Sequence, residues 1–391
     1  MPRPVAHKEV GRVRLLEAAV ELLSERPPSA LSERIIAGRA GVHHTLIIYS
    51  YGSMAALIEE AFSRERERFE AALPDIAFGS STDLPLTPYS EYWRAYVYLV
   101  LDSQLPGLKT VATQAHTLRR LAELLAQCVP QRRADTCTQL AAAWWCLQIG
   151  ALVFDRPLMR GLSVAGGHEA KVRGLVAGRL GALLKIAPDP LPSSDIAPVA
   201  EHQAPKGSTS GRGAVEEHLI EAAIDLLSER SGTGITGREV AERAGVNYGL
   251  IHHYFGSKDA VVDAAFVRLH ERYLEDVVKD DRRAFAAPFG MRAHEAFLRI
   301  WAYRELAGAA TPLIDLKGMR LLLDSIVSRR RIEARRGTRY LEAQASGYCA
   351  VALQLGWVLC RHDLARVSGA REPEILTRLA AVARWFAREA W

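Results

Sequence analysis

The sequence has few of the features that mark secreted, membrane or disulfide-stabilised proteins. Only five of its 391 residues are cysteine, and no two of them form a Cys-x-x-Cys pair. We therefore expect buried apolar thiols in a reducing compartment, and neither a disulfide framework nor a cysteine metal site. The sequence has no N-terminal apolar segment of the signal-peptide type, and no apolar run of about 18 residues. The predicted location is cytoplasmic, with no membrane partner.

Signatures of catalysis are also missing. The chain contains no phosphate-cradling glycine loop, no nucleophile elbow and no cluster of Glu and His at metal-ligand spacing. We predict that it is not an enzyme and that it holds neither a cofactor nor a metal. The net charge is only +5, so charge alone does not predict a polyanionic partner. The arginines of residues 329–339 spread around a helix, which favours a solvated helix end over a site for an acidic ligand or partner.

What the sequence does contain points to helices. Apolar residues make up 49% of the chain, the helix formers Ala, Leu, Glu and Arg dominate, and alternating β-branched residues are scarce. This pattern predicts an all-α fold. A chain of 391 residues is long for one domain, which predicts two or more domains.

An internal repeat explains the length. At an offset of 204 residues, positions 12–62 (the first unit) align without a gap with positions 216–266 (the second unit), and 22 of the 51 aligned pairs are identical. The blocks LLSER and RAGV occur in both units. Agreement of this extent is not accidental, so we predict two tandem copies of one subunit.

The second unit carries a helix-turn-helix pattern in residues 236–259. Thr236, followed three residues later by Glu239, forms a capping box that predicts the start of a helix. Gly245 supplies the positive φ with which that helix can end. A second short helix is expected over residues 247–254. In a helix-turn-helix, this second helix enters the major groove of DNA.

These residues resemble the DNA-binding domain of the TetR family of bacterial repressors. The resemblance rests on EAA at residues 221–223, on RAGV at 243–246 and on HYFGSKD at 253–259. It implies a helix-turn-helix domain followed by a helical ligand and dimerisation domain. The residues implied to hold the phosphate backbone are Thr236, Tyr254 and Lys258. Those implied to face base edges are Asn247, Tyr248, Gly249 and His253. At His252 the family usually has a tyrosine that contacts a phosphate.

The first unit has diverged where DNA would be held. Ser32 can still cap a helix, but Ile35 replaces the capping-box Glu, and Met54 replaces Lys258. The apolar scaffold is intact, which predicts a retained fold with weakened or altered DNA binding. Adjacent helical side chains point away from each other, so a metal pair at positions 43 and 44 is not expected. The residues of this unit expected to face DNA are His43, His44, Thr45 and Tyr49.

The segment after each unit has helical periodicity. Helices are expected in copy one at residues 53–73, 88–105, 109–128, 131–154 and 168–186, and in copy two at 257–279, 291–305, 312–336, 340–361 and 372–389. The aromatic residues expected in the cores are Tyr92, Trp93, Tyr96, Tyr98, Trp144, Trp145 and Trp301. Gly150 and Gly356 would allow two helices to approach closely, and the resemblance implies a four-helix bundle there. Ordinary internal packing is the alternative.

These features predict five domains. They are a degenerate helix-turn-helix domain at residues 1–62, a helical regulatory domain at 63–186, a linker rich in Pro, Gly and Ser at 187–213, a helix-turn-helix DNA-binding domain at 214–266, and a second regulatory domain at 267–391. Copy one denotes residues 1–186 below, and copy two denotes residues 214–391. The linker is long enough for copy two to lie beside copy one.

We expect a transcriptional regulator, acting as a repressor, that binds double-stranded operator DNA and responds to a small-molecule effector. The two copies are predicted to form a monomeric pseudo-dimer with two different reading helices. A homodimer of two chains is the alternative assembly. A hypothesis of another class is a pseudo-dimeric ligand sensor or partner-binding protein that does not bind DNA.

Overall fold

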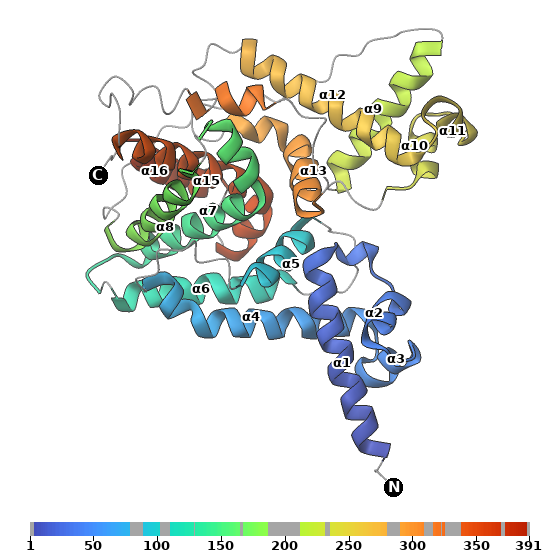
Figure 1. Ribbon diagram of the computed structural model, residues 1–391, viewed down its shortest axis with the longest axis horizontal. Coiled ribbons are helices and arrows are strands. Elements are labelled where there is room, and N and C mark those ends of the chain that lie inside the picture. Colours follow the sequence, from blue (N-terminus) through green and yellow to red (C-terminus); the bar gives the residue numbers. More distant parts are fainter. Residues whose placement is uncertain are drawn as a thin grey trace.

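The protein is all-helical in the part that the structure describes (Figure 1). The computed structural model describes residues 4–78, 89–101, 110–128, 130–164, 167–186, 212–230, 235–279, 290–308, 316–321, 323–324, 338–368 and 372–388. None of these residues forms a strand, which confirms the predicted all-α class. Nearly all of the predicted linker, most of the arginine run at 329–339 and most of the expected helix at 312–336 lie outside the described residues.

Copy one begins with a long helix and a helix-turn-helix, and continues into longer helices. Its α-helices are α1 (Pro4–Glu25), α2 (Glu33–Ala40), α3 (Thr45–Tyr51), α4 (Met54–Phe78), α5 (Ser90–Leu101), α6 (Thr110–Cys128), α7 (Ala134–Gly161) and α8 (Glu169–Ile186). A short 3-10 helix, Pro28–Ala30, lies between α1 and α2.

Copy two repeats this order. Its α-helices are α9 (Arg212–Arg230), α10 (Gly237–Arg243), α11 (Gly249–Phe255), α12 (Lys258–Lys279), α13 (Glu295–Leu306), α15 (Thr338–Ser368) and α16 (Glu372–Arg388). The helix expected at 291–305 begins instead as a 3-10 helix, Gly290–His294, before α13.

The two units fold alike because they bury the same aligned side chains. Leu15 and its counterpart Leu219 have no exposed surface, and the same is true of Ile47 and Ile251 in the short second helices. Full burial of one such side chain stabilises the fold by about 1.5–3 kcal/mol. The repeat found in the sequence is therefore also a repeat of the core.

Helices from both copies pack together at the end of the molecule opposite the two units. Figure 1 shows α7, α8, α15 and α16 grouped there, while α1–α3 and α9–α11 project from the other side. α15 of copy two contacts both α7 and α8 of copy one, and α16 contacts α7. Four helices, two from each copy, therefore form one bundle within a single chain.

The contact between α7 and α15 depends on two glycines. A Cβ atom placed on Gly150 would lie 1.8 Å from the carbonyl oxygen of Ala352, and one placed on Gly356 would lie 1.8 Å from the carbonyl oxygen of Cys146. No side chain fits in such a space. The close approach predicted for Gly150 and Gly356 is confirmed, and it relates the two copies reciprocally.

Two arginines join the copies in a similarly reciprocal way. Arg94 of α5 donates from Nη2 to the carbonyl oxygen of Leu306 at 2.5 Å, at the end of α13. Arg299 of α13 donates from Nη2 to the carbonyl oxygen of Val100 at 2.8 Å, near the end of α5. The last carbonyl groups of a helix accept no hydrogen bond from an N–H of the same helix. Each guanidinium therefore supplies a hydrogen bond to one of these carbonyl groups.

α7 extends further than the periodicity predicts. The expected helix ended at residue 154, but α7 continues to Gly161 through Pro157, with non-helical backbone angles at Phe154 (φ −111°, ψ 17°). Proline lacks the N–H of the helical ladder, so the helix kinks instead of stopping. Part of α7 is long and apolar enough to cross a membrane, with a mean hydropathy of 1.4, but 83% of that window is buried inside the protein. α7 contacts each of the other three bundle helices, α8, α15 and α16.

The cysteines and aromatic residues occupy the core with one exception. Cys137, Cys146, Cys349 and Cys360 are buried free thiols, whereas Cys128 is exposed, so the expectation of burial is wrong for Cys128. It lies at the last residue of α6, where the helix reaches the surface. The seven aromatic residues expected in the cores are all buried.

The glycine contact yields a stability prediction. Gly150→Ala places a methyl group against the backbone of Ala352, so we expect it to lower the free energy of unfolding by about 1–3 kcal/mol. The matched control is Gly178→Ala in α8, where an added Cβ meets nothing within 4 Å. That change should instead raise the free energy of unfolding by about 0.5–1 kcal/mol, because alanine favours the helix. Urea unfolding of both variants measures the difference, and equal stabilities would contradict the close contact.

Candidate nucleic-acid interface

The second unit begins its helix-turn-helix as the sequence predicts. The Thr236 hydroxyl accepts from the backbone N–H of Glu239 at 3.2 Å, and the Glu239 carboxylate accepts from the backbone N–H of Thr236 at 2.8 Å. This capping box satisfies two backbone donors at the start of α10. The turn after α10 contains Gly245 at φ 67°, in the left-handed region where glycine is favoured. Both predicted signals are confirmed.

α11 is the second helix of the motif and presents polar side chains to solvent. Ile251 is fully buried against the rest of the unit, and this fixes which face of α11 points outward. Tyr248, His252 and His253 are exposed on the outer side. The Asn247 side chain accepts from the backbone N–H of Gly249 at 2.8 Å, which orders the turn into the helix.

The remaining predicted residues of the second unit flank α11. Thr236 is exposed at the start of α10. Tyr254 is half-buried, and the edge of one ring meets the face of the other where it contacts His253, with ring centroids 4.9 Å apart. Lys258 is the first residue of α12, and its ammonium lies 3.1 Å from the carboxylate of Asp259 on the surface. The structure therefore brings the predicted set together around one short helix.

Side-chain contacts that the sequence did not predict hold Tyr248. Its ring lies against Gly237, where an added Cβ would come within 2.7 Å of a ring carbon. The imidazole of His252 lies 3.2 Å from the Tyr248 hydroxyl through Nε2 and 3.1 Å from the carbonyl oxygen of Gly256 through Nδ1. The only sequence signal was a glycine at the first position of α10, where the first unit has Glu33.

The first unit keeps the scaffold of the second and changes its surface. Ser32 accepts from the backbone N–H of Ile35 at 3.3 Å, so the cap survives, but Ile35 itself is 38% exposed where the second unit has the capping-box Glu239. On α3, Ile48 and Tyr49 are 51% and 78% exposed. An apolar surface has therefore replaced part of a polar one.

The expectation that the side chains of His43 and His44 point apart is wrong. Their ring centroids lie 4.4 Å apart. Both residues precede α3, which begins at Thr45, so helical geometry does not separate them. The His43 ring also lies 2.9 Å from the Thr45 hydroxyl. No group of three or more possible metal ligands occurs in the described residues.

Equivalent ion pairs connect the first and second helices in each of the two units. Arg243 makes two hydrogen bonds to Glu229 at 2.8 and 2.9 Å, and Arg39 makes two to Glu25 at 2.9 and 3.0 Å. The hydrogen bond from Arg39 holds the pKa of Glu25 below its usual value. Each pair ties the second helix of its unit to the first, so this part of the scaffold is common to both copies.

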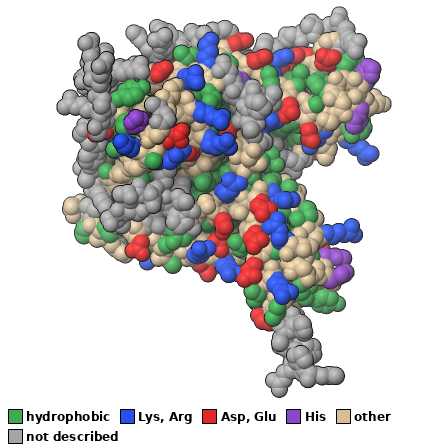
Figure 2. Space-filling model, viewed as in Figure 1, with side chains coloured by type: hydrophobic (Ala, Val, Ile, Leu, Met, Phe, Trp, Pro, Cys, Tyr) green, Lys and Arg blue, Asp and Glu red, His purple; other side chains and the backbone are tan. Residues whose placement is uncertain are grey.

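The second helices of the two helix-turn-helix motifs, α3 and α11, are called the reading helices below, after the helix of this motif that enters the DNA major groove. They lie at the two projecting corners of the molecule on the same side (Figure 1). Figure 2 shows histidine side chains gathered over both corners, with Lys and Arg side chains nearby.

Comparison with known proteins agrees with this geometry. The family model described as "Bacterial regulatory proteins, tetR family" matches the chain twice, at residues 15–61 and 219–265. The HTH-type transcriptional repressor Rv3405c of Mycobacterium tuberculosis is 28% identical over 173 residues, which cover 42% of this chain and 82% of the relative.

Two further relatives match shorter segments. The HTH-type transcriptional repressor KstR2 of Rhodococcus jostii is 30% identical over 89 residues, or 23% of this chain and 42% of the relative. The HTH-type transcriptional regulator BetI of Brucella canis is 41% identical over 51 residues, or 13% of this chain and 26% of the relative. The double family match, these relatives and the repeated helix-turn-helix make the chain a tandem TetR-like, DNA-binding transcriptional regulator.

Proposed function

We propose that one chain is a complete repressor: its two copies form an intramolecular pseudo-dimer that places two different reading helices on operator DNA, and a small-molecule effector changes their spacing. In this proposal residues 1–62 and 214–266 are the DNA-binding domains, residues 63–186 and 267–391 are the regulatory domains, and residues 187–213 link the copies. The observation that carries it is the reciprocal glycine contact between α7 and α15.

This contact supports a pseudo-dimer because it is both close and apolar. Cys146 and Ala352, whose backbones the two glycines meet, are buried, and the sulfur atoms of Cys146 and Cys360 lie 3.7 Å apart across the two helices. An interface of this kind resembles a protein core, as permanent interfaces do. Separating the copies would expose it to water, so the pairing within one chain is expected to persist in solution.

The DNA-binding part of the proposal assigns roles on the second unit. Lys258 and Thr236 stand at helix starts on the exposed side, where they would contact phosphates. Tyr248 and His253 would face base edges from α11, with Asn247 and Gly249 at its start. Tyr254 and His252 complete the proposed set. In the first unit the corresponding residues are His43, His44, Thr45 and Tyr49.

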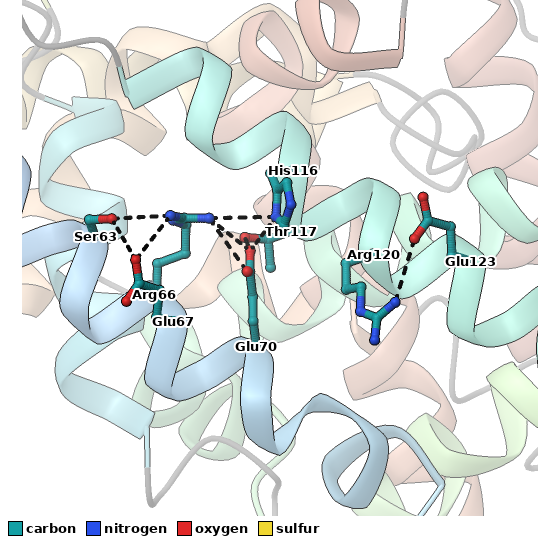
Figure 3. A network of polar contacts seen from close by, with 8 residues as sticks. All are labelled: Ser63, Arg66, Glu67, Glu70, His116, Thr117, Arg120 and Glu123. Atoms are coloured by element: carbon teal, nitrogen blue, oxygen red, sulfur yellow. Dashed lines mark hydrogen bonds and ion pairs between the residues drawn. The ribbon is translucent and has the colours of Figure 1, made fainter.

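A polar network in copy one supports a route from the regulatory part to DNA (Figure 3). Glu70 of α4 accepts a hydrogen bond from Thr117 of α6, and its carboxylate lies 3.1 Å from Nδ1 of His116 and 3.3 Å from Arg66. The side chains of Arg66 and Glu70 are only 13% and 12% exposed. Because α4 starts next to the end of α3, a displacement of α6 would shift the reading helix. Copy two has His270 and Leu274 at the positions of Arg66 and Glu70, so this route belongs to copy one.

A cleft between the copies supports the effector part. It has a volume of about 420 Å³, and its lining includes Glu25 at the end of α1, Arg94 of α5 and Glu305 near the end of α13. Arg94 also donates from Nε to the carbonyl oxygen of Ser24 at 2.8 Å. A ligand that competed for this guanidinium would loosen the link between the first unit and copy two.

Selection of bound fragments from genomic DNA by the purified chain tests the proposal. We expect enrichment of a small number of sites, and release of those fragments by a small molecule present in the cell extract. If no fragment is enriched over random DNA at physiological salt, the alternative of a ligand sensor or partner-binding protein that does not bind DNA replaces this one.

The salt dependence of binding provides a sharper prediction. Neutralising one phosphate contributes about 0.9 to the slope of log K against log salt concentration. Lys258→Ala should therefore weaken binding to all sequences alike and flatten the slope by about one unit. Filter binding across a series of salt concentrations measures both quantities.

The matched control is Lys171→Ala, which removes the same charge from the exposed first turn of α8 in the bundle. It should leave the slope unchanged, because it lies away from the reading helices. If the two variants give the same slope as the unaltered chain, Lys258 does not contact a phosphate.

A further inference from the structure

Both ring nitrogens of His252 are engaged within the second unit. Nδ1 lies 3.1 Å from the carbonyl oxygen of Gly256, and Nε2 lies 3.2 Å from the hydroxyl of Tyr248. A carbonyl oxygen can only accept a hydrogen bond, so Nδ1 must carry the proton. A neutral imidazole has one donor and one acceptor. With His252 neutral, Nε2 is therefore the acceptor, and the Tyr248 hydroxyl donates to it.

This arrangement leaves the Tyr248 oxygen as an acceptor only. Its single proton points to His252, and its lone pairs face away from that bond. A phosphate oxygen cannot donate, so it cannot pair with such a hydroxyl. The exposed side of Tyr248, which is 42% exposed, therefore suits a hydrogen-bond donor on the partner.

The position of this oxygen is fixed. The rings of Tyr248 and His252 are perpendicular, with an interplanar angle of 90° and centroids 5.3 Å apart. On its other side the Tyr248 ring lies against Gly237. A larger residue at position 237 would collide with the ring. A hydroxyl held on two sides loses little conformational freedom on binding, which strengthens discrimination.

In the major groove only two bases present a donor: adenine through its N6 amino group and cytosine through its N4 amino group, whereas the corresponding groups of guanine and thymine are acceptors. We infer that Tyr248 selects a base with an exocyclic amino group, adenine or cytosine, and that His252 is a positioning residue that commits the tyrosine proton. This inference rests on the proposed binding of α11 to DNA.

Copy one has none of the three residues that form this arrangement. Its counterparts of Gly237, Tyr248 and His252 are Glu33, His44 and Ile48. The selection therefore applies to the half-site under copy two alone, which gives the operator a chemical asymmetry beyond the difference in affinity.

The test measures binding of the full chain to an enriched site in which each base pair of one half is replaced in turn. At one position we expect a site with adenine or cytosine on the contacted strand to be bound about tenfold more tightly than a site with guanine or thymine on that strand. Tyr248→Phe should abolish that preference. His252→Ile introduces the residue of copy one and frees the Tyr248 hydroxyl to donate or accept. It should reduce the preference to below about threefold, whatever it does to the overall affinity.

His168→Ile, an exposed histidine just before α8, is the matched control and should keep the full preference. Thermal unfolding of each variant shows whether it is folded at the temperature of the binding assay. The inference is overturned if Tyr248→Phe weakens binding to every sequence equally, or if His252→Ile keeps the tenfold preference. Absence of any sequence-selective binding by the unaltered chain would instead remove the proposed function itself.

Discussion

The backbone contact between α7 and α15 is the constraint on which the rest of the structure depends. At Gly150 and Gly356 the backbones of the two helices lie so close together that neither position has room for a side chain. The reciprocal hydrogen bonds of Arg94 and Arg299 then relate α5 of one copy to α13 of the other. Together they determine how the first and second units project from the bundle, and hence where the reading helices lie.

The two units show how a scaffold and a binding surface can diverge separately. The buried leucines and the Arg–Glu pairs behind the helix-turn-helix are the same in both. The exposed residues are different: His252 and Lys258 in one unit correspond to Ile48 and Met54 in the other. Core packing tolerates little change, whereas surface residues are free to change with the partner that they meet.

Much of this could be predicted from the sequence because the decisive signals are local or repeated. The capping box at Thr236 and the turn at Gly245 depend on nearby residues, and the small size of Gly150 and Gly356 predicted the close helix contact. The continuation of α7 past Pro157 was missed because tertiary packing supports a kinked helix there. The contact of Tyr248 with Gly237 depends on the angle between α10 and α11, which the spacing of residues in the sequence does not predict. The contact of His43 with His44 depends on the residue at which α3 begins.

The central claim is that one chain carries both halves of the DNA-binding assembly. Light scattering of the chain bound to a selected DNA site, over a range of concentrations and together with a footprint of that site, tests it most directly. The account predicts one chain of 43.1 kDa per duplex at every concentration and a footprint that is stronger at one half. Two chains per duplex on a palindromic footprint would contradict it.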